Sequence, residues 1–472
     1  MTAPIESAAS THQPGAWREM KPMLRLAVPI VLAEIGWMSM GIVDTIMVGH
    51  ISDALPGSGA DASGSASALA IGAVSLGQGL YYTVAIFGSG LLLGLDTLVA
   101  QAFGRREHDE ANLSLLHSIY LALMLSPLLM GIVWLWPPLI RQMGVPVEVL
   151  RGMGPFLNAL NWSTLPLLLY FALRRYLQAV DVLKPVTFAL VSANIVNALF
   201  NWIFIFGHWG ARAYGVAGSG WSTCVARIYM ALVLLLALLY NNRQKHWGLL
   251  TTGLKLEWER IRSLLALGLP AASQILFEIG GFTAATALCG KLGAVALAGH
   301  QIAINCAAFT FMVPLGIGSA AAVRVGQEIG RNDPRSARRA GWTAMLLGSA
   351  FMSCSALTFL LFPRQLARIF SPDPAVVRMG ASLLLIAAAF QLFDGLQTVA
   401  TGALRGAGDT RSPMLANLIA YWAIGLPVGW LLCFKLGWGA PGLWIGLCLG
   451  LILIGITLVL VWKHKVLIQP GA

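Results

Sequence analysis

The sequence predicts an all-α polytopic membrane protein whose twelve transmembrane helices form two six-helix lobes. Three observations lead to this fold class. Of the 472 residues, 57% are hydrophobic and only 11% are charged, whereas soluble proteins carry about 25% charged residues. The apolar residues lie in long runs, and part of the pattern occurs twice along the chain. This composition excludes a soluble enzyme, a disulfide-linked secreted scaffold and a disordered chain.

The first half of the chain supplies six candidate spans. A helix needs roughly 20 apolar residues to cross a bilayer core of about 30 Å. The first run follows a Ser/Thr/Ala-rich tail without a basic start, and it is too long for a cleavable signal, so we expect an uncleaved anchor. A Gly/Ser/Ala tract at residues 52–67 predicts a flexible surface loop after it. The six spans lie near residues 24–48, 70–100, 113–136, 153–177, 186–207 and 217–240.

The second half repeats this plan after a basic, polar linker. Several spans in both halves contain proline, which is tolerated because neighbouring helices and Ser/Thr side chains can satisfy the freed backbone groups. The second group lies near residues 263–289, 295–323, 341–362, 378–404, 413–434 and 441–462. The predicted organisation is therefore a tail (1–22), a first lobe (23–240), a linker (241–262), a second lobe (263–463) and a C-terminal tail (464–472).

An internal repeat relates the two lobes. The segment VAQAFGRREHDEA at 99–111 and the segment VGQEIGRNDPRSA at 325–337 carry Gln, Gly and Arg at the same places. The residues 215–218 and 439–442 match at nearly the same offset. Because each lobe has an even number of spans, both enter from the same side, and the pseudo-twofold axis stands along the membrane normal.

The basic residues set the orientation. The net charge is +11, but the 31 Lys and Arg residues form short clusters between apolar runs and do not make one face for nucleic acid. Most of them lie in the N-terminal tail, the even-numbered connections and the C-terminus. The positive-inside rule then places both termini in the cytoplasm of a multi-pass inner-membrane protein, with the clusters as topology signals and lipid contacts.

Ionisable side chains inside the second lobe point to a function. An Asp at the centre of a span costs about 2.5–3.5 kcal/mol even on lenient insertion scales. Asp394 shares one helix face with Gln391 and Thr398, and Glu278 follows Gln274 by four residues. Gln301 and Asn305 show the same spacing on the next span. These polar residues predict a hydrated cavity, although a structural interhelical hydrogen bond would also account for each acid.

The first lobe carries a second polar set. Asn194, Asn197 and Asn201 line one face of the fifth span, and Asp44 lies in the outer part of the first. They predict another polar cavity, with helix packing as the alternative.

Other polar residues are given structural roles. Glu34 is placed facing the bundle, and Asp96, near a helix end, is expected to be a solvated anchor. His117 and His300 have no partner at ligand spacing and are interpreted as satisfied bundle histidines. The six cysteines are interpreted as small hydrophobic residues.

Motifs for soluble chemistry are missing from the sequence. There is no GxxxxGK[ST] phosphate loop, no HExxH and no GxSxG, so neither ATP-driven transport nor catalysis is expected. An ion gradient is left as the energy source.

Three motifs resemble one transporter family. The segments VDTIMVG at 43–49, VAQAFG at 99–104 and GALRGAGDT at 402–410 resemble the multidrug and toxic compound extrusion family, in its NorM-like bacterial branch. The resemblance implies a V of two lobes and export of organic cations in exchange for Na⁺ or H⁺. It also implies cation binding at Glu278 and Asp394 in the second lobe. In the first lobe it implies a site at Asp44 with Asn197, Asn201 and Thr223. Phe390 departs from relatives that carry a tyrosine there, and Asn201 is neutral where some relatives are acidic.

The expected mechanism is competition between two cations for one pocket. A sheltered carboxylate takes up a proton or Na⁺, because burial penalises the bare anion. The expected substrates are amphipathic or cationic small molecules, contacted by Trp37, Met40, Phe309 and Phe311. We expect a monomer without a resident cofactor, and no metal other than Na⁺ at the acidic pair. A lipid-linked oligosaccharide flippase would need a basic central cavity, for which the spans offer only Arg227. A polytopic membrane enzyme would need clustered acids and histidines at one level.

Overall fold

The fold is entirely helical in the part of the chain that the structure describes. The structure is a computed structural model that describes residues 16–51, 60–141, 147–249 and 252–468. Eleven of its helical segments are long and apolar enough to cross a membrane, and the bent pair α6 and α7 completes twelve. The predicted all-α polytopic fold is confirmed.

The described residues of the first half form nine α-helices. They are α1 (Ala16–Gly49), α2 (Ala60–Leu91), α3 (Gly94–Gly104), α4 (His108–Trp134), α5 (Trp136–Arg141), α6 (Val147–Asn161), α7 (Thr164–Ala179), α8 (Lys184–Phe206) and α9 (Val216–Lys245). Two predicted spans are each divided in two. Leu92 and Leu93 separate α2 from α3, and the predicted span 153–177 bends by 46° between α6 and α7.

The predicted loop at 52–67 is partly wrong. Residues 52–59 lie outside the described part, but α2 already begins at Ala60. Five alanines in the segment ADASGSASALA favour helix more than the serines and the glycine oppose it. The second span therefore starts about ten residues earlier than its hydrophobic run indicates.

The second half follows the same plan. It consists of α10 (Trp258–Gly290), α11 (Ala294–Gly330), α12 (Pro334–Leu361), the short α13 (Pro363–Phe370), α14 (Pro374–Gly406), and α17 (Ala440–Ile468). The eleventh predicted span is a composite of α15 (Arg411–Asn417), the π-helix η3 (Leu418–Gly425), α16 (Leu426–Trp430) and the π-helix η4 (Leu431–Lys435). Pro427 cannot donate the regular backbone hydrogen bond, and wider turns flank it.

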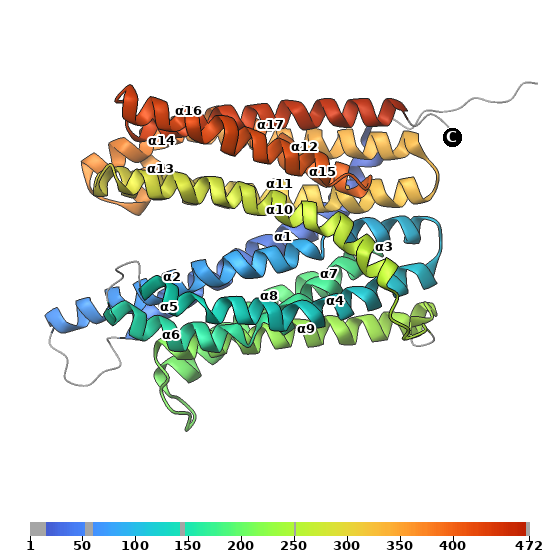
Figure 1. The fold of residues 1–472 in the computed structure, drawn as a ribbon, viewed down its shortest axis with the longest axis horizontal. Coiled ribbons are helices and arrows are strands. Elements are labelled where there is room, and N and C mark those ends of the chain that lie inside the picture. Colours follow the sequence, from blue (N-terminus) through green and yellow to red (C-terminus); the bar gives the residue numbers. More distant parts are fainter. Residues whose placement is uncertain (1–15, 52–59, 142–146, 250–251, 469–472) are drawn as a thin grey trace, which may run out of the picture.

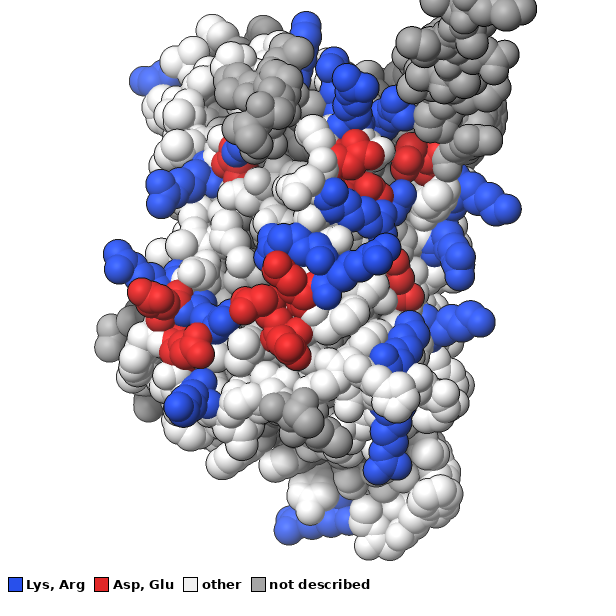
Figure 2. Space-filling view, turned by 90° about the vertical axis from the view of Figure 1, so that its right-hand side faces the viewer, with Lys and Arg blue, Asp and Glu red and all other residues white. Residues whose placement is uncertain are grey.

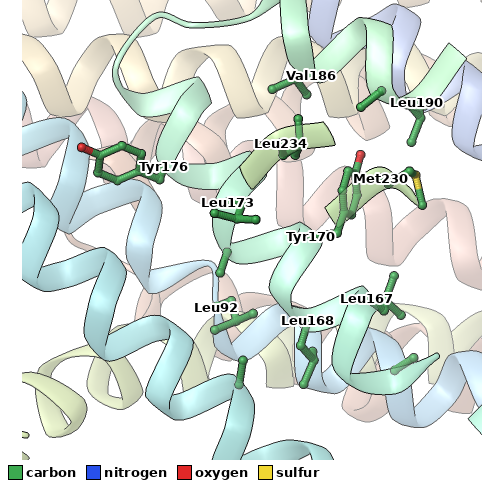
Figure 3. Packing of buried hydrophobic residues seen from close by; sticks show 14 of the residues in the cluster. Leu92, Leu167, Leu168, Tyr170, Leu173, Tyr176, Val186, Leu190, Met230 and Leu234 are labelled. Atoms are coloured by element: carbon green, nitrogen blue, oxygen red, sulfur yellow. The ribbon is translucent and has the colours of Figure 1, made fainter. Parts of the chain in front are cut away.

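Two layers are visible in Figure 1, with α10 to α17 above and α2 to α9 below. Each layer has its own hydrophobic core. Figure 3 shows part of the lower core, to which Leu168 and Leu173 of α7, Leu190 of α8 and Leu234 of α9 contribute. All four side chains are at most 4% exposed, so this packing fixes α7 among its neighbours.

Helices α1 and α10 cross between the layers. Met23 and Ile30, near the start of α1, belong to the upper core, whereas Met40 belongs to the lower. Leu264, near the start of α10, belongs to the lower core, and Cys289 at its end belongs to the upper. The same crossing is visible for α10 in Figure 1. Each core is thus completed by the beginning of a helix from the other half of the sequence.

One end of the bundle, seen in Figure 2, is rich in Lys and Arg. We call it the basic end. It carries the connections at residues 105–107, 180–183, 246–249 with 252–257, 331–333 and 407–410. Each copy of the predicted repeat binds the opposite half there: Gln101 donates to the Gly406 carbonyl (3.1 Å), and Gln327 donates to the Ala179 carbonyl (2.9 Å).

Glycines let the backbones touch at the same place. A Cβ on Gly104 would lie 2.1 Å from the Gln327 carbonyl oxygen, and a Cβ on Gly330 would lie 2.1 Å from the Gln101 oxygen. No real side chain fits such a gap, so glycine is required at both positions. We call these four residues the clasp. Thr97 adds a 2.5 Å hydrogen bond to the Arg405 carbonyl, so the two halves are held together at the basic end.

Candidate cation and substrate sites

Two carboxylates of the second half share one amide. Gln397 Nε2 lies 3.0 Å from Glu278 Oε1 and 3.2 Å from Asp394 Oδ1. Gln274 donates to the other Glu278 oxygen at 2.9 Å. Asp394 is 7% exposed. Within the described residues, the ion pairs include neither acid. The pair therefore carries up to two negative charges with only neutral partners, which leaves room for a cation.

The polar face of α14 is not the one that the sequence analysis described. Gln391 points elsewhere, because its Nε2 donates to Thr310 (2.9 Å) and Ser355 (2.7 Å) on α11 and α12. Thr398 donates to the Asp394 backbone carbonyl at 2.8 Å and so supports the helix beneath the acid. Gln397 occupies the place expected for Gln391. Gln397 could have been found in the sequence, because it follows Asp394 by three residues and such a spacing places two side chains on one helix face.

Several other expected residues lie apart from the acidic pair. Gln301 is exposed and Asn305 half-buried, and the described hydrogen bonds join neither side chain to Glu278 or Asp394. Phe309 is 58% exposed, and Phe311 is half-buried. The predicted polar row on α11 therefore does not form one network with the acids.

A tyrosine that the sequence analysis missed lies close to the acids. Tyr421 of η3 is fully buried, its ring packs against Gly281 and Phe282, and its hydroxyl has no hydrogen-bond partner. Gly281 follows Glu278 by three residues on α10, so the ring packs within about one helical turn of that acid. Phe390, by contrast, stacks on Trp444. The tyrosine of this region is therefore Tyr421 on η3, whereas α14 carries Phe390, which has no hydroxyl.

The first half gathers a second polar network. Asn201 donates to Asp44 Oδ1 at 2.7 Å, and Thr223 donates to Asp44 Oδ2 at 3.0 Å. Asn201 also lies 3.2 Å from Asn197 Oδ1. Asn194 does not join them, because it donates to the Gly36 carbonyl and packs α8 against α1. The structure thus brings together Asp44, Asn197, Asn201 and Thr223.

A guanidinium lies one helical turn beyond this network. Arg227 follows Thr223 by four residues on α9 and is 1% exposed. Its Cζ lies 5.9 Å from the Trp37 ring centroid, and Trp37 also stacks on Tyr170 at 6.2 Å. Met40, the other expected substrate contact on α1, is 5% exposed and belongs to the lower core.

Comparison with known proteins decides the family. The sequence profile of the family MatE matches residues 62–203 and 270–431. The chain belongs to the MatE family. A probable multidrug resistance protein NorM of Mesorhizobium japonicum is 36% identical over 462 residues, covering 96% of each chain. The multidrug resistance protein MdtK of Yersinia pseudotuberculosis is 34% identical over 464 residues, covering 96% of this chain and 97% of its own.

Solved structures show the same fold. The eukaryotic MATE transporter AtDTX14 superposes with a TM-score of 0.84 at 22% identity, over 96% of this chain and 98% of that one. An outward-facing multidrug resistance MATE transporter superposes with a TM-score of 0.81 at 17% identity, over 95% and 96%. Its membership of the MatE family makes this chain a multi-pass membrane protein and not an enzyme.

Two further acids of this MatE chain are paired inside the bundle. Arg174 binds Glu34 directly, which links α7 to α1. Asp96 lies 3.3 Å from both Arg175 and Arg405 and is 1% exposed, so its expected role as a solvated anchor is wrong. The physical reason is the clasp, which brings the end of α14 against α3. That contact could not be derived from the position of Asp96 near a helix end.

The two buried histidines are satisfied, in agreement with the sequence analysis. The Glu257 amide donates to His117 Nε2 at 2.9 Å. His300 accepts the indole N–H of Trp444 at 3.0 Å and lies 2.8 Å from the Thr286 hydroxyl. The described residues contain no cluster of three or more His, Cys, Asp or Glu that could hold a metal ion.

Replacing Arg174 by Met is expected to destabilise this MatE protein strongly. The change leaves the Glu34 carboxylate buried without a counter-ion, which costs about 3–5 kcal/mol. Thermal unfolding in detergent should show a clear drop in Tm. The double variant Arg174→Met, Glu34→Leu should recover most of the loss, because it removes both charges. A single variant as stable as the wild type would contradict the importance of this pair.

Proposed function

We propose that the chain is a secondary active multidrug efflux transporter that exchanges organic, mostly cationic and amphipathic compounds for inward Na⁺ or H⁺. The observation that carries the proposal is the acidic pair, Glu278 and Asp394, which Gln397 bridges and which has no basic counter-ion among the residues that the structure describes. The names of the NorM and MdtK relatives, which describe multidrug resistance, point to the same activity.

The coupling step follows from the cost of buried charge. Two carboxylates in a low-dielectric bundle favour the loaded, neutralised state, in which a proton or Na⁺ is bound. An organic cation competes for the same negative charge. Binding of one cation therefore favours release of the other, and this competition produces exchange.

Alternating access requires two units that move relative to each other. We assign these units to the lobes 23–240 and 263–463, joined by the linker 241–262. By the positive-inside rule the basic end faces the cytoplasm of the inner membrane, together with both termini. The clasp then closes the cytoplasmic side, and its opening would expose the pocket to the cell interior. One copy of the chain contains both lobes, which is consistent with a monomer.

Substrate contacts are assigned to the aromatic surface beside Asp44. Trp37 is half-buried and stacked on Tyr170, so it offers a rigid flat wall. Phe309 and Phe311 on α11 remain candidates for the opposite wall. Met40 follows Trp37 by three residues on α1 and is buried in the lower core. A flippase for lipid-linked oligosaccharide is less well supported, because Arg227 alone does not make a strongly basic cavity.

Reconstitution of the purified protein tests the exchange. Proteoliposomes are given a Na⁺ gradient or a pH gradient separately, with the membrane potential clamped. The clamp matters because one-for-one exchange of monovalent cations moves no net charge. Addition of an organic cation should dissipate one of the two gradients, and this result also identifies the coupling ion. If the substrate crosses the membrane and neither gradient responds, antiport is refuted and uncoupled flipping is favoured.

A further inference from the structure

A small cavity lies between the acidic pair and the basic end. The residues that line it include Gln274, Thr401, Arg405, Asp409 and Thr410. On one side, Gln274 donates to Glu278 at 2.9 Å, so the cavity begins one hydrogen bond away from the acidic pair. On the other side, Asp409 lies in the connection at residues 407–410 of the basic end, where Lys465 binds it at 2.7 Å. The motif GALRGAGDT therefore lines a route from the acids to the basic end.

The cavity is polar, and two of its hydroxyls are unused. Thr401 is 9% exposed and Thr410 is 4% exposed, and neither hydroxyl has a hydrogen-bond partner among the described residues. Leaving a buried hydroxyl unpaired is costly. The cavity measures about 10 Å³, which is close to the space that one water molecule requires. A water molecule, or the hydration water of a small cation, would give these hydroxyls a partner.

Contacts with the first half close this cavity. Arg405 lines it and lies 3.3 Å from Asp96 of α3. Thr97 donates to the Arg405 carbonyl at 2.5 Å, and Gln101 of the clasp donates to the next carbonyl, that of Gly406, at 3.1 Å. The first half therefore holds Arg405 in the wall of the cavity, and separation of the halves at the clasp would release it.

The guanidinium of Arg405 places a positive charge on the route. It is buried, and a positive charge at a constriction opposes the passage of a cation. Asp96 has a second partner, because Arg175 of its own half also lies 3.3 Å from it. Asp96 therefore stays paired when Arg405 moves away, and opening leaves no buried acid without a counter-ion.

We propose that this cavity is the cytoplasmic exit of the coupling cation and that Arg405 is its gate. The proposal rests on the proposed exchange, because it gives the ion of that exchange a route. While the clasp is closed, Arg405 holds the cation back at the acidic pair. When the clasp opens, Arg405 leaves the wall, and the cation passes the hydroxyls of Thr401 and Thr410 toward Asp409. Opening toward the cytoplasm and release of the ion then occur together.

The variant Arg405→Gln tests the gate in proteoliposomes. It removes the charge while Asp96 keeps Arg175, so we expect the protein to fold. Without substrate, the gradient of the coupling ion should dissipate at least about tenfold faster than in the wild type, because a like charge no longer opposes the ion. Arg411 is exposed at the start of α15. The control Arg411→Gln removes the same charge nearby and should leak no more than the wild type.

The double variant Thr401→Val, Thr410→Val tests the route. Both hydroxyls lack a partner among the described residues, so their loss should not lower Tm. Exchange should slow at least about tenfold, whereas the Kd of the ion should change by less than about twofold, because the acids are untouched. The Kd is measured by calorimetric titration with Na⁺ and by proton uptake. Thr283→Val, at an exposed position of α10 beyond Glu278, is the control and should retain wild-type exchange.

Three results would overturn the exit. They are a wild-type leak in Arg405→Gln, wild-type exchange in the double threonine variant, and a Kd that weakens in step with the exchange rate, since the threonines would then belong to the binding site. A wild-type protein without coupled exchange would instead refute the proposed function, and the exit with it.

Discussion

Glu278→Gln and Asp394→Asn are each expected to reduce ion-coupled efflux by at least about 100-fold, equivalent to about 2.7 kcal/mol. An amide has nearly the shape of the carboxylate, but it neither takes up a proton nor carries the negative charge that holds Na⁺. With Gln397 bridging the two acids, loss of either one removes half of the charge that the two cations compete for. The measurement is substrate-driven dissipation of the coupling gradient in proteoliposomes.

A surface acid on the same helix provides the control. Glu259 is exposed near the start of α10, so Glu259→Gln makes the same chemical change outside the pocket and should retain wild-type exchange. If Glu278→Gln and Asp394→Asn both exchange ions as well as this control does, the cation site lies elsewhere, and the Asp44 network becomes the first alternative.

Gly104→Val is expected to abolish tight closure of the basic end and to reduce transport at least about tenfold. The new Cβ would lie 2.1 Å from the Gln327 carbonyl oxygen. Backbone atoms cannot move aside as a flexible side chain can, so the halves must separate. Amide hydrogen exchange should then become faster at residues 97–107 and 325–333, because the clasp no longer shields them. Gly330→Val should give the same result by the symmetric contact.

The variant Gly131→Val is the control that separates the steric clash at the clasp from the change in helix propensity. Nothing lies within 4 Å of a Cβ at Gly131 in α4, so the variant introduces the same side chain into a helix without a steric clash. It should transport and exchange amide protons like the wild type. Equal protection of the clasp in Gly104→Val and Gly131→Val would show that the close approach does not control closure.

Much of the fold could be predicted from the sequence because lipid imposes a simple rule on length and polarity. The twelve apolar runs became helices because a bilayer leaves backbone groups no other partner. The grouping of Glu278 with Asp394, and of Asp44 with Asn201, followed from the small number of acids that a membrane bundle contains. These residues stand out without any knowledge of packing.

The errors at the candidate sites concern relations between helices. Helical spacing places Gln391 and Gln397 about equally close to the Asp394 face, and only packing against α11 and α12 turns Gln391 away. Asp96 was misinterpreted because its partner Arg405 lies in the other half of the chain. The bend at Ser163 carries neither Pro nor Gly at the break itself. A local pattern contains no information about any of these contacts.

The crossing of α1 and α10 has a consequence for how the protein is made. Met23 and Ile30 leave the ribosome early, yet the partner helices of α1 in the upper core, α11 and α12, are synthesised roughly 300 residues later. During translation, the apolar face of α1 that later packs on these helices must therefore stay in contact with lipid until they are inserted. The two halves therefore cannot complete their folding one after the other as separate units. In a chain that stops at the linker, the start of α1 would lack its packing partners from the second half.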